Sequence, residues 1–167
     1  MILGLDVSSS KIGYSIIDQD KKLLMCEFKK FKTSTSLETR ALEFHSTLLD
    51  LSKKFQISKV MIEAPFVAFG GGRSSAQTVA TLQRFNGMIS LLVPIVFDME
   101  SEMITPAAAR KKQGIKVPRG ENTKKIIIEW VSQTYPNDFI VELTRHGNPR
   151  PGTDDMADSV LVALAAL

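Results

Sequence analysis

The chain has 167 residues, close to the roughly 150 residues of one domain, and we expect residues 1–167 to form a single domain. Hydrophobic residues make up 44% and charged residues 23%, which excludes an intrinsically disordered chain and favours a globular protein. The net charge of +3 is unevenly placed: residues 106–125 contain seven basic residues and one acid, so they carry +6 and the remainder carries −3. A basic patch on a mildly acidic body suggests a polyanionic partner, although a solvated helix face would look the same.

Three features of the sequence bear on its location. Asp6 interrupts the apolar start, and no basic region precedes it, which is unlike a signal peptide. The longest apolar stretch, Ile89–Phe97, contains Pro94 and is much shorter than the roughly 20 residues of a membrane span. The only cysteine, Cys26, excludes an intrachain disulfide and is typical of a reducing compartment. We therefore expect a soluble cytoplasmic protein without a membrane partner.

Three short apolar runs open the chain. Their polar connections predict antiparallel strands at Ile2–Ser8, Ile12–Asp18 and Leu23–Phe31. From Ser36 the apolar residues recur every three or four positions, which predicts an amphipathic helix that ends near Phe55, with Ser36 as its N-cap.

The rest of the chain is predicted to alternate strands with helices and then to continue with helices. The elements are a strand at Lys59–Glu63, a helix at Ser74–Leu92, a strand within Ile95–Thr105, a short basic helix at Pro106–Lys112, a helix at Asn122–Tyr135 with Ile126, Ile127, Trp130 and Val131 inward, a loop at Gly147–Thr153 and a helix at Asp154–Leu167. The two later strands return through helical crossovers and should be parallel to their neighbours. This order predicts an α/β fold: a mixed five-stranded sheet with helices on both faces.

Four acidic residues stand where acids are awkward. Asp6 lies inside an apolar strand, Glu63 ends a second one, and Asp155 and Asp158 share a face in the first turns of the last helix. A lone buried carboxylate is costly, and several that converge repel each other unless a metal ion neutralises them. Hard oxygen ligands select Mg²⁺ or Mn²⁺ rather than Zn²⁺.

Each acid also has a simpler explanation. Asp6 could accept hydrogen bonds from loop amides, and Glu63 could be a salt-bridged strand end. Asp155 and Asp158 could complement the helix dipole, and Asp154 beside them competes for the same site. The four together point to a metal site more strongly than any one of them.

The positions of these acids resemble those of the RuvC family of Holliday junction resolvases, in the ribonuclease H-like superfamily. Ile2–Asp6 followed by Gly13–Ile17 resembles the opening of that family, and Met61–Glu63 resembles its second acidic strand. Asp155–Asp158 resembles its Asp-x-x-Asp closing helix.

The chain also departs from the family. Val7 and Ser8 stand where the family usually has Pro-Gly, and Ser159 replaces an alanine after the final Asp. These departures suggest a divergent branch, such as a viral one acting in the host cytoplasm.

The resemblance implies a ribonuclease H-like fold, a homodimer and metal-dependent cutting of four-way or branched DNA. It implies two Mg²⁺ ions, for which Mn²⁺ would substitute. The implied catalytic residues and metal ligands are Asp6, Glu63, Asp155 and Asp158, with Asp6 bridging the two ions.

The expected DNA contacts come from the basic segment and from the glycine-rich loop after Glu63. The predicted contact residues are Phe69, Arg73, Arg110, Lys111, Lys112, Lys116, Arg119, Lys124 and Lys125. An exposed Phe69 could stack on an unpaired base, whereas Phe66 is expected to pack into the core.

Other functions remain as alternatives. A YqgF-like nuclease that processes RNA would share the fold, although the Asp-x-x-Asp helix suits it less well. A non-catalytic module that binds branched DNA would have no electrostatic reason to keep four acids together. Actin-like and sugar-kinase ATPases begin similarly but need two domains and a second glycine-rich phosphate loop.

Overall fold

The computed structural model describes residues 1–65 and 75–167 and contains one five-stranded sheet in the order β3-β2-β1-β4-β5. The strands are β1 (Ile2–Val7), β2 (Lys11–Ile17), β3 (Leu23–Lys30), β4 (Lys59–Glu63) and β5 (Ser101–Ile104). The first three form an antiparallel meander, whereas β4 pairs parallel with β1 and β5 pairs parallel with β4. The predicted mixed sheet and its two parallel crossovers are confirmed.

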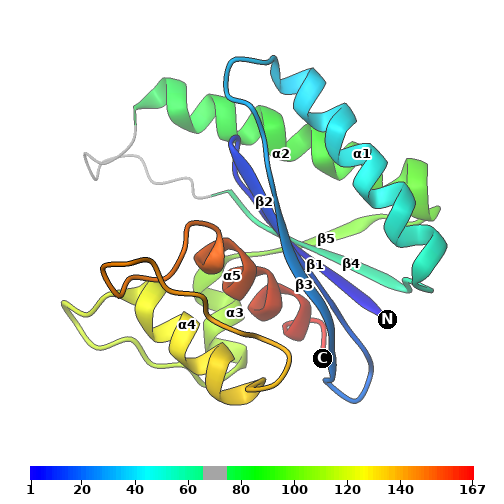
Figure 1. Ribbon diagram of the computed structural model, residues 1–167. Coiled ribbons are helices and arrows are strands. Elements are labelled where there is room, and N and C mark those ends of the chain that lie inside the picture. Colours follow the sequence, from blue (N-terminus) through cyan, green and yellow to red (C-terminus); the bar gives the residue numbers. More distant parts are fainter. Residues whose placement is uncertain (66–74) are drawn as a thin grey trace.

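Helices cover both faces of the sheet, as predicted (Figure 1). Helices α1 (Leu37–Lys54) and α2 (Ala76–Phe97) lie on one face. On the other face lie α3 (Pro106–Lys112), α4 (Thr123–Thr134) and α5 (Thr153–Leu164). Ser36 caps α1 as predicted, its hydroxyl accepting a hydrogen bond from the Thr39 amide, and Asn122 caps α4.

The alternation of side chains along the strands divides the core into two. Leu3 and Leu5 of β1 pack with α1 and α2, whereas Ile2 packs with α5. Gly4 is on the α5 side, where an added Cβ would lie 2.3 Å from the Ser159 carbonyl oxygen. Because neighbouring residues of a strand face opposite ways, every second residue of β1, including Asp6, faces α5.

Helix α2 extends five residues beyond the predicted end at Leu92, and the strand predicted within Ile95–Thr105 is β5, at Ser101–Ile104. Pro94 falls in the last turn, where a proline removes one hydrogen bond without ending the helix. The helix ends at Asp98, which is left-handed with φ of 53° and donates its amide to the Pro94 carbonyl.

The extended α2 changes the expectation drawn from its apolar stretch. With 22 residues and a mean hydropathy of 1.4 over its best window, α2 is long and apolar enough to cross a membrane by length and composition alone. It nevertheless packs beside α1 and buries Phe85, Asn86, Ile89 and Val93. A single such helix is weak evidence for a membrane, and helices of soluble cores pass the same test.

The inward face of α4 also differs slightly from the prediction. Ile127, Ile128 and Val131 are buried, whereas Ile126 and Trp130 are half-buried. The buried face of α4 therefore includes Ile128 in place of Ile126 and Trp130. This is the face that packs on α5, a helix that is itself mostly buried.

Candidate metal and DNA-binding site

Two of the predicted acids lie side by side on neighbouring strands. Leu5 of β1 is opposite Ile62 of β4 in the parallel register, so Asp6 and Glu63 follow at the same end of the sheet. Met61, two residues before Glu63, packs in the core on the α5 side, and Glu63 faces that side by alternation. The strand register therefore brings Asp6 and Glu63 together beneath the start of α5.

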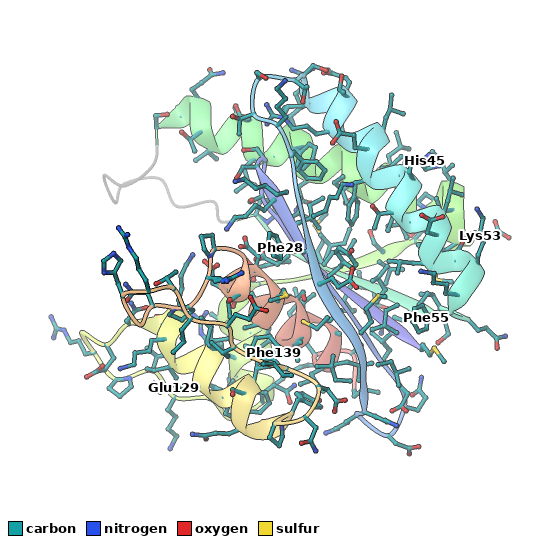
Figure 2. The ribbon with its side chains drawn as sticks, viewed as in Figure 1. Phe28, His45, Lys53, Phe55, Glu129 and Phe139 are labelled. Atoms are coloured by element: carbon teal, nitrogen blue, oxygen red, sulfur yellow. The ribbon has the colours of Figure 1, made fainter. Side chains whose placement is uncertain are left out.

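Helix α5 carries the other two acids across β1 and β2. This close crossing requires Gly13, where an added Cβ would lie 2.0 Å from the Asp155 carbonyl oxygen. Gly152 begins the helix with φ of 102°, a left-handed conformation that favours glycine. A Cβ there would also lie 2.6 Å from the Phe28 ring, which is labelled beside the start of α5 in Figure 2. Two glycines thus fix where Asp155 and Asp158 are placed.

The four carboxyl groups are electrostatically coupled. Burial, and next the charges of Glu63 and Asp158, hold the pKa of Asp6 well above its usual value. Burial and the charge of Asp158 raise the pKa of Glu63 to about 8, although Arg110 opposes the shift. Burial also raises the pKa of Asp158 to about 6 and raises that of Asp155. The structure therefore gathers all four predicted acids into one electronegative site.

Two lysines partly neutralise this site. Lys11 forms an ion pair with Asp155, and its ammonium nitrogen lies 3.9 Å from Asp154 Oδ1. Lys124 forms an ion pair with Asp154. Burial raises the pKa of Asp154, but the Lys124 hydrogen bond and the charges of Lys124 and Lys11 outweigh it and lower that pKa to about 2.

Lys11 was not among the predicted site residues. A usable indication was its position two residues before Gly13, since strand alternation places both on the α5 side of β2. Asn86 was also missed. Its buried side-chain amide donates a hydrogen bond of 3.1 Å to the Glu63 carbonyl. This bond ties the end of β4 to α2.

The donor chemistry of the site suits a hard divalent cation. All four candidate ligands are carboxylates, and their mutual repulsion is the kind that such an ion relieves. Within residues 1–65 and 75–167, however, no three metal-ligating side chains are placed closely enough to share an ion.

Some of the predicted basic residues lie near the acids, and others have partners elsewhere. Arg110 and Lys124 act on the charges of Glu63 and Asp158. Lys125 is exposed on α4 and lies 3.8 Å from Glu129, its neighbour one turn along. Lys112 instead donates a 2.5 Å hydrogen bond to the Ala165 carbonyl, at the opposite end of α5 from the acids.

The remaining predicted DNA contacts are less constrained. Lys111, Lys116 and Arg119 are exposed on α3 and the segment that follows it. Phe66, Phe69 and Arg73 lie in the segment 66–74, outside the described residues, so their roles stay predictions.

A groove of about 730 Å³ adjoins the acidic site between α4 and the segment 141–151. Its lining includes Lys124 and Asp154, the ion pair beside the acidic site, together with Lys125 and Arg150. Arg150 is paired at 2.9 Å with Glu142. Cationic side chains in this position are suited to bind the phosphates of a nucleic acid whose backbone reaches the carboxylate cluster.

No protein-family model matches the chain, and no curated protein matches its sequence. Solved structures do match. RuvC of T. thermophilus in complex with a Holliday junction substrate has a TM-score of 0.70 and 16% identity, over 98% of this chain and 90% of that one. The yeast mitochondrial Holliday junction resolvase has a TM-score of 0.60 and 13% identity, over 98% of this chain and 76% of that one. Fowlpox virus resolvase, bound to Holliday junction DNA, has a TM-score of 0.51 and 18% identity, over 99% of this chain and 95% of that one.

These likenesses define the fold of the chain. It is a ribonuclease H-like fold, with a mixed five-stranded sheet between helices. More particularly, it is the form of that fold found in RuvC-type Holliday junction resolvases.

Proposed function

We propose that the protein is a metal-dependent endonuclease that cuts Holliday junctions or other branched DNA. The observation that carries this proposal is the convergence of Asp6, Glu63, Asp155 and Asp158 at one end of the sheet. The convergence occurs on the fold of RuvC-type resolvases, two of which were solved with Holliday junction DNA.

The cofactor we propose is Mg²⁺, as two ions, with Mn²⁺ as a substitute. Asp6 would be the shared ligand because it lies on β1, the central strand of the sheet. Bound divalent ions would lower the pKa of an attacking water and stabilise the leaving oxygen of a phosphodiester. The chain's own part is to hold the carboxylates under α5 and to bind the phosphates beside them.

The DNA would be held mainly by cations that flank the acids. Arg110 and Lys124 are near the carboxylates, and the groove along α4 adds Lys125 and Arg150. Phosphate contacts of this kind position the substrate without specifying sequence.

We also propose that the protein works as a homodimer, which would supply two sites for the two cuts of a four-way junction. Leu91 and Ile95 support this arrangement, because each is 63% exposed and they lie one turn apart on α2.

Leu91→Glu with Ile95→Glu should shift the protein toward monomer in light scattering. Ile140→Glu is the control, since Ile140 is 74% exposed but lies outside α2. A double variant that stays dimeric would place the interface elsewhere.

The test of the proposed function is a cleavage assay on four-way junctions, forks, flaps and structured RNA, with Mg²⁺ and with EDTA. The parent should cut branched DNA only with metal, and Asp6→Asn should bind junctions but not cut them. Cleavage of RNA alone would favour a YqgF-like nuclease, and binding without any cleavage would favour a non-catalytic module. Near-normal cutting by Asp6→Asn would contradict the assignment of the site.

A further inference from the structure

The two lysines beside the acids differ in how firmly they are held. The Lys11 side chain is 24% exposed and pairs with Asp155, whose side chain is 9% exposed. The Lys124 side chain is 66% exposed and pairs with Asp154, which is 21% exposed. The first pair is therefore shielded from solvent, whereas the second lies at the surface.

The backbone holds Lys11 in this position. The Ser8 amide donates to the Lys11 carbonyl at 2.9 Å, and the Lys11 amide donates to the Ser8 hydroxyl oxygen at 3.1 Å. The Ser8 hydroxyl in turn donates to the Lys11 carbonyl at 2.8 Å. This tight connection between β1 and β2, together with strand alternation, directs the Lys11 side chain to the face on which Asp6 and Glu63 lie.

The carboxylates are thereby divided into two groups. Asp155 has an ammonium partner in Lys11, and Asp154 has one in Lys124. Asp6, Glu63 and Asp158 have no ion pair within 4.0 Å in the described part of the chain. A first divalent ion would therefore meet the three unpaired carboxylates without having to displace a cation.

We infer that the Lys11 ammonium stands in the place of the second cation, so that two divalent ions bind with unequal affinity. The first ion draws together Asp6, Glu63 and Asp158, which without an ion are not placed closely enough to share one, and the second binds only when Lys11 gives up Asp155. The ammonium is an effective competitor because it is tethered at the site. It is also shielded from water, and charge-assisted pairs are strongest where water is excluded. This inference rests on the proposed function, which supplies the expectation of two ions.

The test is a Mn²⁺ binding isotherm of the metal-free full-length protein, with free Mn²⁺ measured by electron paramagnetic resonance. The parent should bind one ion tightly and a second more weakly. Lys11→Met should strengthen the second site by about tenfold, which is the effect expected from losing one charged hydrogen-bonded competitor. The first site should be almost unchanged.

Three variants make the comparison specific. Lys11→Arg keeps a tethered cation and should keep the weak second site. Lys124→Met removes a surface lysine of the same charge and should strengthen the second site much less than Lys11→Met does. Thermal unfolding in EDTA checks that each variant is folded, and Lys11→Gln replaces Lys11→Met if the methionine variant is not.

Two outcomes would overturn the inference: a parent that binds both ions with equal affinity, or a folded, Lys11-free variant whose second site is unchanged. These outcomes are distinct from failure of the proposed function. A parent that binds no Mn²⁺ and cuts no branched DNA would contradict that function, whereas equal affinities with normal cleavage would contradict only the role of Lys11.

Discussion

Replacing Asp158 with Asn should stabilise the metal-free protein. Burial, opposed by Lys124 and reinforced by Asp154 and Asp155, raises the pKa of Asp158 from 3.8 to about 6. A carboxyl group with a raised pKa favours the folded state fully below its unfolded pKa and loses that contribution as pH rises through its folded pKa. The difference between 3.8 and about 6 corresponds to about 3 kcal/mol. Asn has nearly the same size and no charge to bury, so it escapes this cost.

The assay is urea unfolding in EDTA at a series of pH values. Asp158→Asn should be more stable than the parent by up to about 3 kcal/mol at pH 8. The difference should shrink as the pH falls through 4 and should vanish at about pH 3 and below, where the parent carboxyl is mostly protonated in both states. Added Mg²⁺ should stabilise the parent more than the variant. An equal gain at both ends of the pH range, or a loss at pH 8, would refute the electrostatic reasoning.

Asp154→Asn is the matched control on the same helix, and its effect should have the opposite sign. The pKa of Asp154 is lowered to about 2, so its carboxylate stabilises the fold above pH 4, and that contribution is lost as pH falls through about 2. Its loss should cost about 1 kcal/mol at pH 7, a value discounted for the solvent around the exposed Lys124. Cleavage should fall much less than with the other acids of the site.

Three further predictions concern the site and its surroundings. Asp155→Asn should reduce the cleavage rate by a hundredfold or more, about 3 kcal/mol, in single-turnover assays, and an active variant would remove Asp155 from the metal ligands. Neutralising Lys124 and Lys125 should lower the slope of log affinity against log salt by about one to two units, and an unchanged slope would make these lysines a solvated face. Gly13→Ala should destabilise the fold by about 3 kcal/mol in urea, because its Cβ would meet the backbone of α5. Gly87→Ala, whose Cβ meets nothing within 4 Å, is the control, and an equal cost at both positions would contradict the packing argument.

The sequence was a good guide to whatever depends on neighbours along the chain. Short apolar runs and the polar connections between them predicted β1, β2 and β3 to within one residue at each end, and the run at Lys59–Glu63 matches β4. The three- and four-residue periods predicted four of the helices, and the fifth, α3, was expected as a short basic helix. The exception was the end of α2, because the helix continues past Pro94 and its last residues, Val96 and Phe97, pack against the core.

The sequence alone also determined which carboxylates to suspect, because an acid inside or at the end of an apolar strand is anomalous wherever the strand lies. Which cations meet those carboxylates was decided only by tertiary structure. Lys11 and Asp155 are 144 residues apart, and Lys124 and Asp154 are 30 apart, so no local period connects them. The Lys11 pair depends on α5 crossing the sheet closely over Gly4 and Gly13, whereas the Lys124 pair depends on α4 packing against α5. Both are contacts between distant segments that packing alone creates.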